Sequence, residues 1–353
     1  MALEQLGTPD APTFGLDTFG DRGTDADGSQ VSHADAIRQV VEEAELADRL
    51  GIDFFGVGEH HRDDFAVSAP DVVLATIAGR TSRIRLGTSV TVLSSDDPVR
   101  VFERFATLDA LSDGRAEVTL GRGSFTESFP LFGLRLEDYE VLFSEKLDLF
   151  AEVLREKPVT WHGTIRPPLD AQTVYPPTES GRLPAWIGVG GTPTSVLRAA
   201  RYDMPLVLAV IGGSPAQFVP LADLYRRALS ELGHAQLPIS MHSPGHIAES
   251  DEQAVEQMFS HQREAFTRIG RERGWAPYTR EAFDAMTGPT GALFVGSPET
   301  VARKIAWAVR TLGLSRFQLK YSVGSQPNAD RLSSIRLYGE QVVPRVRELL
   351  AAS

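Results

Sequence analysis

The sequence predicts an α/β protein of the (β/α)8 barrel class, with insertions after the fourth and seventh strands. Short apolar runs alternate with amphipathic helical patterns along its 353 residues, and eight such pairs can be counted. Most of the apolar runs end in Gly, Ser or His. An open doubly wound sheet is the alternative, but such sheets rarely sustain the alternation this long. We therefore expect a single barrel domain over residues 1–353, with functional residues at the carboxyl ends of its strands.

The eight apolar runs define the expected strands. The second run, Ile-Asp-Phe-Phe-Gly-Val-Gly, stops abruptly at Glu59, His60 and His61. A buried strand has this pattern when its carboxyl end opens into a polar pocket. The expected strands comprise residues 13–19, 52–58, 84–93, 116–120, 185–189, 205–210, 238–247 and 316–323.

Helical periodicity separates these strands. Behind Ser32, apolar side chains recur every three or four residues, and Gly51 ends the pattern. Pro98 begins another helix, at a position where a missing N–H costs little. The expected helices comprise residues 32–50, 71–80, 97 onward, 137–156, 192–202, 215–232, 251–273, 297 onward and 330–350.

Two segments interrupt the alternation. Residues 157–184 carry six prolines and no helical period, so we expect a surface excursion there. Residues 251–291 begin with a helix over 251–273 and continue as an irregular stretch over 274–291. We expect both insertions to shape access to the site.

Composition and charge exclude several classes of function. A net charge of -12 argues against a nucleic-acid partner or an anionic membrane surface. The absence of cysteine excludes disulfides, thiolate metal sites and cysteine nucleophiles. Because there is neither a signal-peptide pattern nor an apolar run of about 18 residues, we expect a cytoplasmic protein.

The best phosphate-binding candidate is Gly190-Gly191-Thr192, which directly follows a buried strand. Ser195 adds a hydroxyl one turn into the following helix, and Arg122 follows the fourth strand. Glycine allows close approach of the backbone, a helix N-terminus attracts anions, and a guanidinium grips phosphate with two hydrogen bonds. The alternatives are that Thr192 only caps its helix, and that phosphate binds after strands seven and eight, as is general for barrels.

His60 is a candidate acid, base or ligand-orienting donor, or else a structural histidine under a loop. A metal site shared with His61 is disfavoured, because adjacent residues of an extended segment point to opposite sides. A serine hydrolase is disfavoured because no Gly-x-Ser-x-Gly elbow is present. A dinucleotide fingerprint also fails, since Pro193 stands where its last glycine belongs.

Short motifs stand in a fixed order along nearly the whole chain. They lie at residues 55–61 (Phe-Gly-Val-Gly-Glu-His-His), 83–88, 97–100, 109–115, 120–123, 187–191 and 295–301. Each motif alone is modest, but the ordered set is specific. It resembles the bacterial luciferase-like flavin-dependent monooxygenase and oxidoreductase family.

This resemblance implies a TIM barrel that binds reduced FMN, or in some branches a deazaflavin. His60 matches the active-site histidine beside the flavin ring. Ser89-Val90 falls where these barrels often carry a non-prolyl cis peptide under the ring. The other matched residues would hold the phosphate. The implied cofactor-binding residues are Ser89, Val90, Arg122, Gly123, Ser124, Gly190, Gly191, Thr192 and Ser195, and no metal is implied.

The implied activity is monooxygenation of a small organic substrate by reduced FMN and dioxygen through a flavin hydroperoxide, with a separate reductase supplying the reduced flavin. Where luciferase has a reactive cysteine this chain has Gly121, so light emission is not implied. A homodimer is expected through early helices, including the one with Phe102 and Phe105. The alternatives are a deazaflavin-dependent oxidoreductase and a non-catalytic flavin-binding protein.

Overall fold

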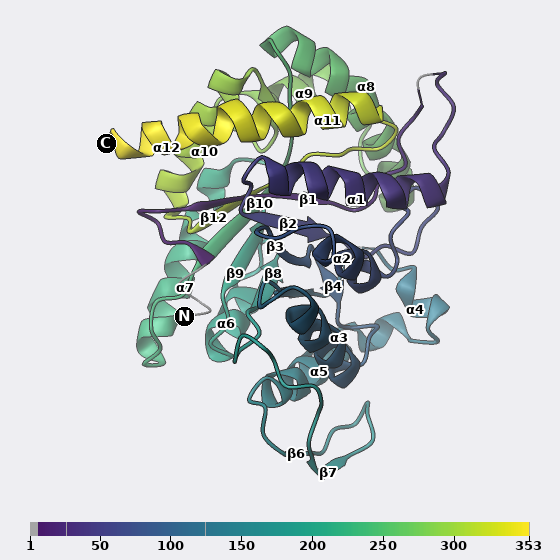
Figure 1. Cartoon of the computed structure of the whole chain (residues 1–353), viewed down its shortest axis with the longest axis vertical. Helices are drawn as coiled ribbons and strands as arrows, with labels where there is room; N and C mark the ends of the chain where they lie inside the picture. Colours follow the sequence, from purple (N-terminus) through teal and green to yellow (C-terminus); the bar gives the residue numbers. More distant parts are fainter. Residues whose placement is uncertain (1–5, 26, 124, 353) are drawn as a thin grey trace.

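The strands form a nearly closed parallel barrel surrounded by helices (Figure 1). This computed structural model describes residues 6–25, 27–123 and 125–352. Neighbouring strands follow the order β3-β2-β1-β12-β10-β9-β8-β5-β4, and an isolated parallel bridge between Leu86 and Ala116 links the two ends. The strands are β1 (Thr13–Thr18), β2 (Phe54–Val57), β3 (Arg85–Thr88), β4 (Thr91–Val92), β5 (Val118–Gly121), β8 (Ala185–Val189), β9 (Leu206–Ala209), β10 (Ile239–Ile247) and β12 (Arg316–Lys320). The predicted barrel is confirmed.

The strand predicted over residues 84–93 is observed as two pieces, β3 and β4. They lie on either side of a cis peptide bond between Ser89 and Val90. β3 pairs with β2, whereas β4 pairs with β5. The other seven predicted strands each correspond to one observed strand. The register aligns His242 of β10 with Gln318 of β12, and Asp17 of β1 with Gly56 of β2.

The helices begin largely where capping residues were predicted. The Ser32 hydroxyl accepts a hydrogen bond from the Asp35 N–H, and Asp97 accepts bonds from Val99 and Arg100, so both side chains satisfy first-turn donors. The helix predicted over 330–350 is interrupted by a π-helical turn at Tyr338–Val342. The helices are α1 (His33–Arg49), α2 (Pro70–Ala78), α3 (Pro98–Leu111), α4 (Ser128–Leu131), α5 (Tyr139–Val153), α6 (Pro193–Arg201), α7 (Val219–Glu231), α8 (Asp251–Arg273), α9 (Arg280–Thr287), α10 (Pro298–Leu312), α11 (Asn328–Leu337) and α12 (Val343–Ala351).

Two segments lie at opposite ends of the molecule in Figure 1. The proline-rich excursion contains an antiparallel hairpin of β6 (Val159–Trp161) and β7 (Leu169–Gln172). The helix predicted over 251–273 is confirmed as α8. The irregular stretch predicted over 274–291 is wrong, because it contains α9, and β11 (Phe294–Gly296) follows and pairs with β10.

A separate small hydrophobic core explains why α9 forms in the stretch that was predicted to be irregular. Phe283 of α9 is fully buried against Phe259 of α8, with ring centroids 5.2 Å apart, and Met258 and Val295 join the same cluster. Thr279 caps α9 by accepting a hydrogen bond from the Ala282 N–H. A helix this short is stabilised by tertiary packing rather than by its own periodicity, so a window of sequence carries little signal for it.

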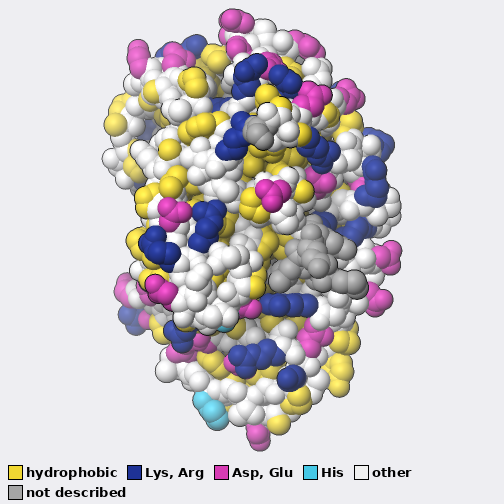
Figure 2. Space-filling view, turned by 90° about the vertical axis from the view of Figure 1, so that its left-hand side faces the viewer, with side chains coloured by type: hydrophobic (Ala, Val, Ile, Leu, Met, Phe, Trp, Pro, Cys, Tyr) yellow, Lys and Arg dark blue, Asp and Glu magenta, His cyan; other side chains and the backbone are white. Residues whose placement is uncertain are grey.

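The main core lies between the strands and the surrounding helices. Phe102 and Phe105 of α3 are buried in this core. Because both rings pack within the chain, any contribution of α3 to a dimer would come from its exposed residues. The homodimer itself stays a prediction. On the face shown in Figure 2, acidic and basic side chains are interspersed rather than gathered in one basic surface. In the described residues, no helix combines the length and apolar character that crossing a bilayer requires.

Candidate active site

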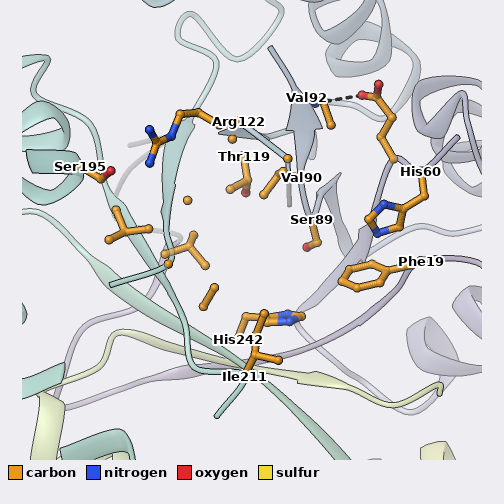
Figure 3. Close-up of a pocket in the computed structure, with 18 of the residues that line it drawn as sticks. Phe19, His60, Ser89, Val90, Val92, Thr119, Arg122, Ser195, Ile211 and His242 are labelled. Atoms are coloured by element: carbon orange, nitrogen blue, oxygen red, sulfur yellow. Dashed lines mark hydrogen bonds between the residues drawn. The ribbon is translucent and has the colours of Figure 1, made fainter. Parts of the chain in front are cut away.

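The carboxyl ends of the strands surround a cavity of about 270 Å³ (Figure 3). Its wall brings together seven of the predicted residues, namely His60, Ser89, Val90, Arg122, Gly123, Gly190 and Ser195. Gly191 and Thr192 are exposed next to Gly190 and do not line the cavity. Ser124 lies outside the described residues. Figure 3 shows Arg122 and Ser195 at one end of the cavity and Phe19, His60 and His242 at the other.

Two arginines meet one carboxylate at the first end of the cavity. Arg122 donates a hydrogen bond to Glu140 Oε1, and Arg198 Nη2 donates to Glu140 Oε2 at 3.3 Å. The two guanidinium side chains are only 25% and 14% exposed, whereas the Glu140 side chain is 63% exposed. Tyr139 donates a hydrogen bond to the Gly123 carbonyl, 3.1 Å away. This end therefore concentrates positive charge that an exposed carboxylate partly neutralises.

The N-terminus of α6 completes this end. Thr192 occupies the N-cap position but makes no side-chain cap bond; its hydroxyl lies 2.8 Å from that of Ser195 instead. By contrast, Ser214 caps the next helical segment with a full capping box. Gly191 adopts a φ of +124°, a conformation that favours glycine. A cap hydroxyl that its own helix does not use is suited to an anion at that helix N-terminus.

The floor of the cavity is built around the Ser89-Val90 peptide, whose cis geometry agrees with the resemblance. A Cβ at Gly121 would lie 2.5 Å from Val90 Cγ2, and a Cβ at Gly56 would meet the Ser89 hydroxyl. Both positions therefore require glycine with the present packing. The same crowding explains why position 121 has no room for the cysteine of luciferase.

His60 lies in an aromatic enclosure at the other end of the cavity. Its ring centroid is 4.6 Å from that of Phe19, 4.5 Å from Phe65 and 5.1 Å from Phe125. Its Nε2 is buried, and no hydrogen-bond partner for it is found among the described residues. Burial lowers the pKa of His60 to about 3, so the imidazole is neutral near pH 7.

Glu59 and His61 pair with each other rather than with His60. His61 Nε2 lies 3.0 Å from Glu59 Oε1, and the other Glu59 oxygen accepts a hydrogen bond from the Val92 N–H at 2.9 Å. These two side chains thus tie the loop after β2 to β4. The adjacent histidines do not converge, and the described part of the chain brings no three His, Asp or Glu side chains together as metal ligands.

The sequence reasoning missed a second histidine in the cavity wall, His242 of β10. Its Nδ1 lies 2.8 Å from Oδ2 of Asp17, a fully buried carboxylate on β1. The available signal was an aspartate inside the apolar first strand, since buried carboxylates need a partner. The reasoning also missed Arg198, which lies three residues after Ser195 and hence on the same side of α6, and the competing carboxylate of Glu140.

Comparison with known proteins identifies the family. Residues 14–316 match the family described as luciferase-like monooxygenase. The chain therefore belongs to that family. Limonene 1,2-monooxygenase of Rhodococcus erythropolis is 27% identical over 319 residues, which cover 88% of this chain and 81% of that protein.

Solved structures support the same fold. Monooxygenase RslO1 from Streptomyces bottropensis superimposes with a TM-score of 0.81 at 24% identity, covering 94% of this chain and 99% of that one. The oxygenating constituent of 3,6-diketocamphane monooxygenase from Pseudomonas putida, in complex with FMN, gives 0.77 at 17% identity, with 95% and 99% covered. An F420-dependent secondary alcohol dehydrogenase gives 0.72 at 18% identity, with the same coverage.

Proposed function

We propose that this protein is a monooxygenase that uses reduced FMN and dioxygen to oxygenate a small organic substrate. The observation that carries the proposal is that one cavity is lined both by Arg122 and Ser195 and by His60, whose Nε2 has no hydrogen-bond partner in the described part of the chain. Family membership supports the reaction class. The flavin hydroperoxide route, a separate reductase and a cytoplasmic location belong to this proposal.

The residues at the first end fit a phosphate. Arg122 and Ser195 line this end, and Arg198, the Thr192 hydroxyl and the N-terminus of α6 lie next to them, bonded to Glu140 or to Ser195. Space is open where a Cβ of Gly190 would stand, so the backbone can be approached closely. Phosphate entry requires Glu140 to leave the arginines, and the high exposure of its side chain permits that movement.

The other end fits a flavin ring. When bound, reduced FMN would supply two electrons to dioxygen, with one oxygen atom entering the substrate and the other leaving as water. Neutral His60 is placed to exchange a hydrogen bond through Nε2. Phe19, Phe65 and Phe125 keep water away from that nitrogen, which strengthens any polar contact made there.

Two other functions remain as alternatives. A deazaflavin-dependent oxidoreductase would use the same fold, as the similarity to the F420-dependent dehydrogenase indicates. A non-catalytic flavin-binding protein is the second alternative. The buried His60 Nε2, which has no hydrogen-bond partner among the described residues, favours catalysis over the second alternative, because flavin storage does not require such a group.

Cofactor titration tests the proposal. The protein is titrated with FMN and with F420, each in oxidised and anaerobically reduced form, and binding is followed by flavin absorbance and fluorescence. We expect reduced FMN to bind more tightly than reduced F420. Tighter binding of F420 would favour the deazaflavin alternative, and binding of neither cofactor would refute the proposed function.

A further inference from the structure

The cavity contains a second imidazole in a setting unlike that of His60. His242 lines the cavity from β10, and its Nδ1 contacts Asp17 Oδ2 at 2.8 Å. This hydrogen bond leaves Nε2 for a ligand, and no protein group among the described residues bonds to that nitrogen. The two histidines lie on opposite sides of Phe19, whose ring stacks at 6.0 Å from the His242 ring and meets His60 edge-on at 4.6 Å.

The carboxylate of Asp17 is buried and pairs with His242. Its side chain has no exposed surface, and Oδ1 lacks a hydrogen-bond partner within the described ranges. A carboxylate bonded to one imidazole nitrogen fixes the tautomer and stabilises the protonated ring, so that the second nitrogen carries the exchangeable proton. Among the described residues, no carboxylate bonds to His60. Two titratable groups in such different environments are suited to different roles.

Resting on the proposed function, we propose that His242 is a catalytic residue that relays a proton through Nε2, and that Asp17 is its positioning residue. In the overall reaction, substrate, dioxygen and reduced FMN give oxygenated substrate, water and oxidised FMN. His242 gives the Nε2 proton to the departing oxygen, which leaves as water when substrate is present and as hydrogen peroxide when it is absent. Bound reduced FMN would supply two electrons and two hydrogens to the overall reaction, and one of these hydrogens would return to Nε2 as a proton, so that His242 is unchanged after each turnover.

Few other charged groups face His242. From β12, Gln318 is its neutral register partner, and it donates a hydrogen bond to Ser240. Lys320 of the same strand lies 4.5 Å from the Phe19 centroid and is paired with Asp21 at 2.9 Å. From β9, the register partner is Ala209. His60 lies beyond Phe19 and stays neutral above about pH 4, because its pKa is about 3. Asp17 is therefore the direct ionic partner of His242.

Oxidation of the reduced cofactor tests this role without knowledge of the substrate. Anaerobically reduced FMN bound to the protein is mixed with dioxygen, which yields oxidised FMN and hydrogen peroxide. The rate of FMN formation is measured by stopped-flow absorbance from about pH 5 to about pH 9, the range in which imidazoles titrate. Wild type is compared with His242→Gln, Asp17→Asn and His60→Gln.

We expect His242→Gln to slow the reaction by roughly 100-fold and to remove the inflection from the pH profile. Asp17→Asn should also slow the reaction while FMN still binds, because the amide no longer holds the imidazole in the tautomer that carries a proton on Nε2. His60→Gln should change the rate without moving the inflection. His234→Gln is the matched control, since His234 faces Asp203 at 3.8 Å outside the cavity. An inflection that persists in His242→Gln, or that vanishes in His60→Gln, would overturn the proposal.

Two further measurements separate this role from structural effects. Dissociation constants for FMN and circular dichroism spectra identify variants that have lost the fold. If Asp17→Asn does not fold, His242→Ala with added imidazole replaces it: recovery of the rate supports the relay, and an unchanged rate overturns it. Absence of FMN binding by wild type would refute the proposed function itself. Normal FMN binding by wild type, together with the same pH profile of the rate in His242→Gln as in wild type, would refute only the role of His242.

Discussion

Arg122 and Arg198 both bind Glu140, so one of the two positive charges at this end of the cavity is already balanced by the chain itself. A ligand phosphate has to replace that carboxylate. Because the phosphate carries more charge and offers more acceptor oxygens than a carboxylate, it can engage both guanidinium groups and the nearby hydroxyls together. The affinity for a ligand phosphate therefore depends on how much more tightly the two arginines bind phosphate than they bind Glu140. The next two substitutions test this competition.

Arg122→Ala should weaken FMN binding by about 10-fold to 100-fold, as expected for loss of a charge-assisted hydrogen bond. Riboflavin binding should change much less, because riboflavin has no phosphate. Fluorescence titration with both flavins measures the difference. The matched control is Arg155→Ala, since Arg155 pairs with Glu152 on the surface, away from this cavity. Equal losses for FMN and riboflavin would place the phosphate elsewhere.

Glu140→Gln should strengthen FMN binding several-fold, because the neutral amide competes less well for the two arginines. Riboflavin binding should stay the same, and the gain for FMN should shrink as salt screens the charges. The same titration at low and high ionic strength measures both effects. Weaker FMN binding in this variant would mean that Glu140 supports the site rather than competing for it.

His60 should make the fold sensitive to acid. Its pKa is about 3 in the folded protein against 6.5 for an unperturbed histidine. Between these values the unfolded chain takes up a proton that the folded chain does not, so stability is lost as the pH falls from 6.5 toward 3. The loss from pH 7 to pH 5 is about 2 kcal/mol for this group.

Denaturant unfolding of wild type and His60→Gln at the two pH values checks this prediction. The variant should lose less stability on acidification, although the lowered pKa of buried His246 leaves both proteins some acid sensitivity. The matched control is substitution of His33, an exposed residue at the start of α1, by Gln. Equal acid sensitivity of wild type and His60→Gln would contradict the burial argument.

Among the elements, the C-terminal end of α8 contacts the loops that enclose His60. Arg62, in the loop after β2, donates hydrogen bonds to both Glu272 oxygens at 2.8 and 2.7 Å, and also bonds to Glu127. Its guanidinium carbon lies 4.6 Å from the centroid of Phe125, which in turn contacts His60. The insertion after the seventh strand is thus connected to the end of the cavity that contains His60.

Glu272→Ala should loosen this connection. Glu272 is 44% exposed, so we expect a loss of about 1 kcal/mol or less in global stability. The larger effect should be local, with faster amide hydrogen exchange in residues 125–132 and easier access of water to His60. Mass spectrometry after exchange measures it. Glu256→Ala, at an exposed position of the same helix, is the control; identical exchange in both variants would contradict the connection.

At the scale of the whole molecule, the predicted homodimer now needs different contacts. The early helices still expose apolar side chains, with Val72 of α2 at 61% and Leu111 of α3 at 58%. Sedimentation velocity should give twice the mass of one chain, and Val72→Glu should shift the protein toward monomer. Leu232→Glu, at an exposed apolar position after α7, is the control. A monomeric wild type at micromolar concentration would refute the dimer.

Much of the fold follows from local sequence. Alternating apolar runs and amphipathic periods locate the barrel strands and the long helices, because burial on a strand or a helix face imposes a period that a short window reveals. The π-helical turn, α9, β11 and the β6–β7 hairpin escaped prediction. Their stability comes from contacts with distant residues, as Phe283 shows by packing on Phe259.

The same division holds for the site. Sequence patterns alone were enough to predict the family, the barrel and seven of the cavity-lining residues, because residues at the carboxyl ends of parallel barrel strands gather at one end of the barrel. Which charged side chains pair with each other became visible in the folded structure alone. Asp17 and His242 are 225 residues apart, and Arg198 and Glu140 are 58 apart. Partner choice between such side chains depends on strand register and helix placement, which no local pattern encodes.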